Sequence, residues 1–272
     1  MDIASLQNPR VKHIVKLRED KRQRQKDGLL LVEGFDEIQL AISAGHKPQT
    51  VLSAPELASG QLTFPSAETR RGEPVETLTV SRAVFEKMSY RDNPDGWLAV
   101  FPIPKTSLES ESLLSENPLV IVAESIEKPG NLGAILRTAD AARVDALLVP
   151  NPRVDAWNPN VVRASRGAAF SVPVVECDNA SALEWLKSHG LQILAATPSA
   201  EALYSDVDMR QPTAIAVGAE DKGLTDFWMD NADVKVKIPM MGRVNSLNVS
   251  VSTALIVYEA IRQRGKTPRR AE

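Results

Sequence analysis

The chain has 272 residues, of which 43% are hydrophobic, and its formal net charge is −3. This size predicts one or two domains with sizeable cores, and the charge excludes a uniformly basic nucleic-acid binder. No apolar run reaches the roughly 18 residues of a bilayer span, and the polar N-terminus lacks the apolar stretch of a signal peptide, so we expect a cytoplasmic protein. The single Cys177 excludes an internal disulfide framework, and the scattered histidines make no metal spacing, so we expect no metal.

The first predicted element is a basic leading helix near residues 10–26, where basic residues outnumber acidic ones. Such a segment can bind phosphates, although a solvated helix face explains the same pattern. A second basic run lies at residues 262–270, where a solvated arm is the simpler interpretation. The candidate phosphate-binding residues of the first segment are Arg10, Lys12, Arg22 and Arg24.

The next stretch predicts a small α/β module. Its strands are expected at residues 29–34, 77–81 and 96–101, and its helix at 36–45, where Gly45 ends the apolar pattern.

A segment rich in Ser, Glu and Pro follows this module and has the composition of a linker. We therefore predict an N-terminal domain at residues 1–104, a linker at 105–118 and a second domain at 119–272.

The second domain alternates apolar strands with helical stretches, which predicts a mainly parallel sheet covered on both faces. The strands are expected near residues 119–123, 145–149, 191–196, 213–217 and 234–238.

Three polar loops interrupt the apolar runs of this domain. The strand at 119–123 runs into ESIEKPGNLGAILR, and the strand at 213–217 opens onto GAEDKGL, whose glycines let the backbone approach a ligand closely. The strand at 234–238 is stopped by Pro239 and leads into the polar turn GRVNSLN before an apolar helix predicted at 247–261.

NLGAILR, VGAEDKG, IPM and NSLNVS occur in this order, and together they resemble the motifs of the SpoU (TrmH-type) RNA ribose 2′-O-methyltransferases of the SPOUT superfamily. The resemblance covers roughly residues 118–265. The stretch LLLVEGFDEIQLAI is similar to the N-terminal RNA substrate-binding domain of many such enzymes. The resemblance implies transfer of a methyl group from S-adenosylmethionine to a ribose 2′-hydroxyl of a structured RNA, ribosomal RNA first and tRNA next.

Two architectural features are implied by the resemblance. The first is a C-terminal trefoil knot, whereas sequence patterns alone would predict an ordinary doubly wound fold. The second is a homodimer, which agrees with a last helix that is apolar on more than one face.

For the cofactor S-adenosylmethionine, the resemblance implies binding by Gly218, Ile238 and Leu247, with Met240 and Val249 as apolar lining. Residue type alone would assign Ile238, Leu247 and Val249 to ordinary core packing.

For catalysis, the resemblance implies Arg137 as the essential residue, with a salt bridge on an exposed helix face as the alternative. Because a guanidinium is a poor base that stays charged at neutral pH, we interpret Arg137 as a group that holds a target phosphate and stabilises the developing 2′-alkoxide. The matching positions around it are Asn131, Glu220, Ser246 and Asn248.

Arg163 and Arg166 in VVRASRGAAF resemble a family stretch near the substrate entrance, which makes them candidate RNA ligands. Two arginines exposed on a helix are the alternative. For the whole chain, the alternatives to a housekeeping enzyme are an antibiotic-resistance methylase and a non-catalytic RNA-binding or ribosome-assembly protein.

Overall fold

The computed structural model describes residues 2–63, 72, 74–110 and 113–265, so most of the basic run at 262–270 lies outside the described residues. The chain divides into two compact units. The first comprises Met1–Lys105 and Trp157–Ser171, and the second comprises Thr106–Ala156 and Val172–Glu272. The boundaries expected from the sequence, 1–104 and 119–272, stay a prediction, and the structure adds that residues 157–171 group with the first unit.

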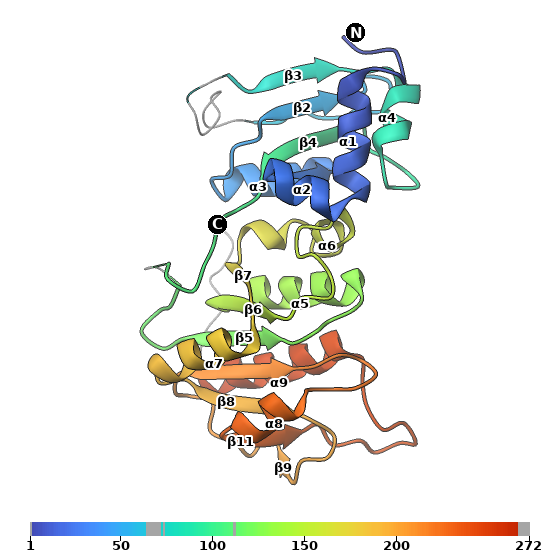
Figure 1. The fold of residues 1–272 in the computed structure, drawn as a ribbon. Helices are drawn as coiled ribbons and strands as arrows, with labels where there is room; N and C mark the ends of the chain where they lie inside the picture. Colours follow the sequence, from blue (N-terminus) through green and yellow to red (C-terminus); the bar gives the residue numbers. More distant parts are fainter. Residues whose placement is uncertain (1, 64–71, 73, 111–112, 266–272) are drawn as a thin grey trace. The chain divides into compact units, whose positions relative to one another are not determined.

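The first unit contains a four-stranded sheet in the order β1-β4-β2-β3 (Figure 1). Strands β1 and β2 pair antiparallel with β4, and β3 pairs parallel with β2. The predicted strands and helix occur at nearly the expected bounds, and β2 was not expected. The elements are α1 (Pro9–Glu19), α2 (Lys21–Asp27), β1 (Leu29–Glu33), α3 (Phe35–Ser43), β2 (Thr50–Ser53), β3 (Glu76–Thr79), α4 (Arg82–Met88) and β4 (Trp97–Pro102).

Helix α1 shows how the basic segment folds. Asn8 caps its N-terminus, because the side-chain oxygen accepts from the backbone N–H of Arg10 at 2.9 Å. Val11, Ile14 and Leu17 follow at helical spacing and are buried in the core of the unit, so the charged residues between them face outward.

Residues 157–171 form α6 (Pro159–Ala164) and a 3₁₀ turn at Ala168–Phe170. The Phe170 ring packs 5.5 Å from that of Phe101 and 6.1 Å from that of Trp157. This aromatic cluster explains why the segment groups with the first unit, although its neighbours in sequence belong to the second.

The second unit contains a seven-stranded sheet in the order β7-β6-β5-β10-β8-β11-β9, in which every pair is parallel. The predicted parallel sheet is therefore confirmed. Strands β7 and β9 add to the five strands predicted from the sequence. The strands are β5 (Leu119–Ala123), β6 (Ala146–Pro150), β7 (Val174–Cys177), β8 (Gln192–Ala196), β9 (Ala202–Leu203), β10 (Thr213–Val217) and β11 (Val234–Lys237).

Helices cover both faces of this sheet (Figure 1). Helices α7 (Asn179–Ser188) and α8 (Asp226–Asn231) share a core cluster with Val120 and Val122 of β5. Side chains alternate along a strand, so Ile121 faces the other side, where α5 (Pro129–Ala141) packs against α9 (Val249–Gln263) and α9 contacts β10. The trefoil knot stays a prediction.

Candidate functional site

The parallel strands of the second unit bring three loops to one edge of the sheet. Thr197, Gly218 and Ile238 are the first residues after β8, β10 and β11, respectively. Parallel strands end at the same edge, and ligands of α/β sheets bind outside these carboxyl ends.

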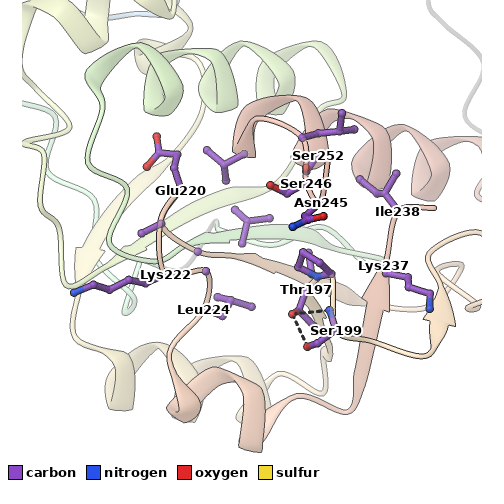
Figure 2. Close-up of a pocket in the computed structure, with 18 of the residues that line it drawn as sticks. Thr197, Ser199, Glu220, Lys222, Leu224, Lys237, Ile238, Asn245, Ser246 and Ser252 are labelled. Carbon is purple, nitrogen blue, oxygen red and sulfur yellow. Dashed lines mark hydrogen bonds between the residues drawn. The ribbon is translucent and has the colours of Figure 1, made fainter. Parts of the chain in front are cut away.

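A pocket of about 480 Å³ opens at this edge, a volume in the range of small-molecule sites (Figure 2). Its lining combines apolar, neutral polar and charged residues, the charged ones being Glu220, Asp221, Lys222, Asp226 and Lys237. The lining residues are 196–199, 217–224, 226, 229, 236–238, 240, 245–247, 249, 252 and 256.

The residues predicted to bind the cofactor all line this one pocket, although they come from two separate loops and the first residue of α9. In Figure 2, Glu220 lies on one side of the pocket and Ile238 on the other, with Ser246 between them. The five predicted cofactor positions on its wall are Gly218, Ile238, Met240, Leu247 and Val249.

The loop 218–224 folds tightly on itself. The backbone N–H of Gly223 donates to the carbonyl of Ala219 at 2.9 Å. A Cβ atom added to Gly218 would lie 2.1 Å from the backbone carbon of Gly223, closer than any side chain permits. Glycine at position 218 therefore lets the two ends of the loop meet and leaves backbone groups on the pocket wall.

Three of the predicted catalytic residues form one hydrogen-bonded cluster. The side-chain nitrogen of Asn131 donates to the Glu220 carboxylate. The side-chain oxygen of Asn131 accepts from the side-chain nitrogen of Asn248 at 3.1 Å. Helix α5, the 218–224 loop and the N-terminus of α9 are joined in this way. Since Glu220 holds Asn131, the carboxylate serves to order the loop and the amide.

The loop before α9 presents two further residues of the predicted set. Asn248 caps the helix, because its side-chain oxygen accepts from the backbone N–H of Ser250 at 3.0 Å. Ser246, two residues earlier, lines the pocket and is exposed. The cap thus fixes the position at which the loop carrying Ser246 enters the helix.

Arg137 lies on α5 with its side chain exposed. In the described part of the chain it makes no hydrogen bond or ion pair, so the alternative of a surface salt bridge has no support there. The structure does not bring Arg137 into hydrogen-bond contact with the Asn131–Glu220–Asn248 cluster. A cation without a partner is available to an anionic ligand.

The candidate RNA ligands of α1 and α2 differ in their surroundings. Lys12 and Arg22 are exposed, and Arg10 forms an ion pair with Glu76 at 2.5 Å. Arg24 does not fit the expectation, because it is buried and its guanidinium donates to the carbonyl of Leu17 at 2.7 Å. A guanidinium held in this way supports the end of α1 and is not placed for a phosphate.

Arg163 and Arg166 are both exposed, and both belong to the first unit through α6 and the residues after it. Their charge is therefore carried by the same unit as the basic α1 and α2.

The sequence reading missed several groups of the site. Thr197 and Ser199 line the pocket, and their hydroxyls lie 3.0 Å apart (Figure 2). Thr197 could have been found, because it directly follows the predicted strand 191–196. Glu124 was also missed; it is buried at the end of β5, close to the 218–224 loop.

Cys177 has no role in this pocket. Burial, with the negative charges of Asp178 and Glu176, raises the pKa of its thiol to about 12. Such a thiol is a poor nucleophile at neutral pH. Within the described ranges, no group of three or more His, Cys, Asp or Glu could hold a metal ion. Nor is any helix among those residues long and apolar enough to cross a membrane.

Comparisons with known proteins agree with this geometry. The model of the SpoU rRNA Methylase family matches residues 118–258, and that of the MRM3-like substrate binding domain matches residues 8–99. The 23S rRNA (guanosine-2′-O-)-methyltransferase RlmB of Pseudomonas syringae pv. tomato is 35% identical over 215 residues, which cover 73% of this chain and 86% of that protein.

Two solved structures extend the likeness over nearly the whole chain. An RNA 2′-O ribose methyltransferase is 42% identical with a TM-score of 0.83, and the match covers 98% of this chain and 100% of the other. An AdoMet-bound rRNA methyltransferase from Sinorhizobium meliloti is 27% identical with a TM-score of 0.86, and the match covers 96% and 97% of the two chains. Since the family model alone spans more than half of the residues, the chain belongs to the SpoU rRNA methylase family.

Proposed function

We propose that this protein uses S-adenosylmethionine to methylate a ribose 2′-hydroxyl of a structured RNA. Ribosomal RNA is the first candidate substrate, and tRNA is the second. One observation carries the proposal. Every predicted cofactor residue lines a single pocket, and that pocket includes Glu220 of the Asn131–Glu220–Asn248 cluster. The names of the relatives, an rRNA methyltransferase with AdoMet bound among them, support the same substrate class. An RNA substrate also implies a cytoplasmic protein.

The pocket fits the cofactor in size and in chemistry. S-adenosylmethionine supplies a methyl group on a sulfonium, which a nucleophilic oxygen can accept. Backbone groups next to Gly218 and Ile238 can bind the adenine edge and the ribose, while Leu247 and Val249 offer apolar contact. The chain's contribution is to hold the cofactor in one orientation relative to the RNA.

Methyl transfer to the 2′-oxygen would break the sulfonium S–CH₃ bond and release S-adenosylhomocysteine, while the hydroxyl proton would pass to solvent water. Because this proton is only weakly acidic, the developing alkoxide needs stabilisation. Arg137 is exposed and unpaired among the described residues, and it can hold a phosphate of the target nucleotide with two parallel N–H groups. The same charge lowers the energy of a nearby alkoxide. Asn131, Ser246 and Asn248 then fix the hydroxyl and the surrounding backbone.

The first unit supplies the proposed RNA-binding surface. Lys12, Arg22, Arg163 and Arg166 are exposed cations on this unit, while the chain as a whole carries a net charge of −3. Contacts with the phosphate backbone position a structured RNA without reading its bases. A non-catalytic RNA-binding protein would require no assembled cofactor pocket, and this pocket favours the enzyme.

The test is transfer of labelled methyl from S-adenosylmethionine to RNA. Purified protein is incubated with total RNA from cells that lack the gene, and label in the RNA is counted. We expect incorporation that stops when S-adenosylhomocysteine is added. Binding of the cofactor without transfer to any RNA, including ribosomal subunits at different assembly stages, would favour the non-catalytic alternative.

We further propose that the protein is a homodimer that uses α9. This helix leaves large apolar side chains on the surface of the second unit, and a continuous apolar stripe of this kind is stable when a partner covers it. The helix buries its other side against α5 and β10. The exposed residues of α9 and their relative exposures are Val251 at 47%, Leu255 at 39% and Tyr258 at 50%.

Leu255→Arg is expected to convert the dimer into monomers at micromolar concentration, because each subunit would bury an unpaired guanidinium group in the interface. Sedimentation velocity of the wild type and the variant measures the change. Leu6→Arg is the matched control, since Leu6 is an exposed leucine of the first unit and its substitution should leave the dimer intact. A monomeric wild type would contradict the proposal.

A further inference from the structure

A buried carboxylate lies directly behind the pocket loop. Glu124 follows β5 and is fully buried, and both of its oxygens accept hydrogen bonds. One oxygen accepts from the Thr225 hydroxyl at 2.7 Å and from the Asn179 side chain at 3.0 Å. The other accepts from the backbone N–H of Thr225 at 2.8 Å. The described part of the chain holds this carboxylate with neutral donors only, since no ion pair involves Glu124 there.

Glu124 is bonded to both ends of the same loop. Its backbone N–H donates to the carbonyl of Val217 at 2.9 Å, at the last residue of β10. Its carboxylate accepts from Thr225, the residue that begins α8. The seven residues between these two points, 218–224, are all on the pocket wall.

The hydroxyl of Thr225 is committed to this contact. A threonine at the start of a helix usually accepts from a backbone N–H of the first turn, but Thr225 makes no such cap and donates to Glu124 instead. The helix start is therefore fixed by the carboxylate. Loop residue Glu220, which holds Asn131, has its position set between the two anchored ends.

We propose that Glu124 is a positioning residue that preorganises the 218–224 loop for cofactor binding by holding both loop ends. The inference rests on the proposed function, because it assigns S-adenosylmethionine to this pocket. Glu124 itself is not among the residues that line the pocket. The backbone bond to Val217 does not depend on the side chain, so without the carboxylate the Thr225 end of the loop would have to be ordered when the cofactor binds, and the cost would appear as weaker affinity.

Glu124→Gln separates this role from simple burial. Glutamine keeps the volume but replaces one acceptor oxygen with an N–H₂ donor, so one of the three donors from Thr225 and Asn179 must lose its partner or face another donor. Hydrogen bonds to a buried charged group are strong, and we expect the dissociation constant for S-adenosylmethionine to rise about tenfold or more. In the cofactor-free protein, we expect amide hydrogen exchange of the 218–225 segment to accelerate.

Two further variants locate the effect. Thr225→Val removes only the hydroxyl donor and should weaken cofactor binding in the same direction, whereas Thr225→Ser should retain near-normal binding. Trp228→Phe breaks the 2.9 Å bond from the indole to Asn179 and leaves the direct bonds between Glu124 and Thr225 in place. It should lower thermal stability and leave the cofactor dissociation constant unchanged.

Calorimetric titration with S-adenosylmethionine and hydrogen exchange decide between the outcomes. Weaker binding and faster loop exchange in Glu124→Gln, with normal binding in Trp228→Phe, support the inference. Equal affinity in wild type and Glu124→Gln overturns it. The inference is also overturned if all variants, Trp228→Phe included, lose cofactor affinity in proportion to their loss of melting temperature. If Glu124→Gln does not fold, Thr225→Val decides in the same way. If the wild type binds no S-adenosylmethionine, the proposed function is overturned instead. This outcome is read from the wild type alone and is independent of the variants.

Discussion

Replacing Arg137 with alanine is expected to lower the rate of methyl transfer by about 100- to 1000-fold, the usual loss when one donor to a developing oxyanion is removed. The dissociation constant for S-adenosylmethionine should stay unchanged, because Arg137 is not among the residues that line the pocket. Single-turnover transfer to RNA, together with calorimetric titration of the cofactor, measures the two quantities separately.

Arg137→Lys tests the planar, two-pronged role of the guanidinium. A lysine keeps the charge but cannot donate two parallel hydrogen bonds, so its rate should also be low. Arg143→Ala is the matched control, since Arg143 is an exposed arginine just after the same helix. Near-normal turnover of Arg137→Lys would show that a point charge suffices and that the bidentate phosphate contact is wrong.

Gly218→Ala should abolish measurable cofactor binding, with a loss of affinity of about 100-fold or more. The added Cβ would lie 2.1 Å from the backbone carbon of Gly223, and neither backbone segment can give way without opening the loop. Displacing one wall of the pocket removes several backbone contacts together, each worth about 1 kcal/mol, in addition to the strain. Calorimetric titration with S-adenosylmethionine gives the affinity, and circular dichroism checks the fold.

Gly130→Ala is the control for this substitution. Gly130 lies in the first turn of α5, and a Cβ there would meet nothing within 4 Å. It should fold and bind the cofactor as the wild type does, since alanine is a better helix former than glycine. Normal cofactor affinity in Gly218→Ala would mean that the 218–224 loop is not a wall of the cofactor site.

The sequence was most informative where the spacing of apolar residues and the order of strands and loops along the chain determine the structure. The strands 119–123 and 213–217, apolar except for Thr213, are buried on both faces, so their parallel pairing was predictable from their composition. The polar loops after 213–217 and 234–238 then had to meet at one edge, where the pocket is found. The assignment of individual residues to that pocket came from the motif order and not from residue type.

Other features depend on contacts that no local pattern reveals. Arg24 belongs to a basic run, yet it is buried because the carbonyls at the end of α1, such as that of Leu17, need donors. Residues 157–171 group with the first unit through aromatic packing on Phe170. Glu124 gains its partners from segments more than fifty positions away, so its place behind the loop could not be read from the chain.

The most direct test of the account is identification of the methylated product. RNA labelled by the purified protein is digested to nucleosides for mass spectrometry, and a second sample is treated with alkali. We predict a 2′-O-methylated nucleoside and an alkali-resistant linkage at its position, because the methyl group removes the hydroxyl that attacks the neighbouring phosphate. Label on a base, with the linkage still cleaved by alkali, would contradict ribose methylation.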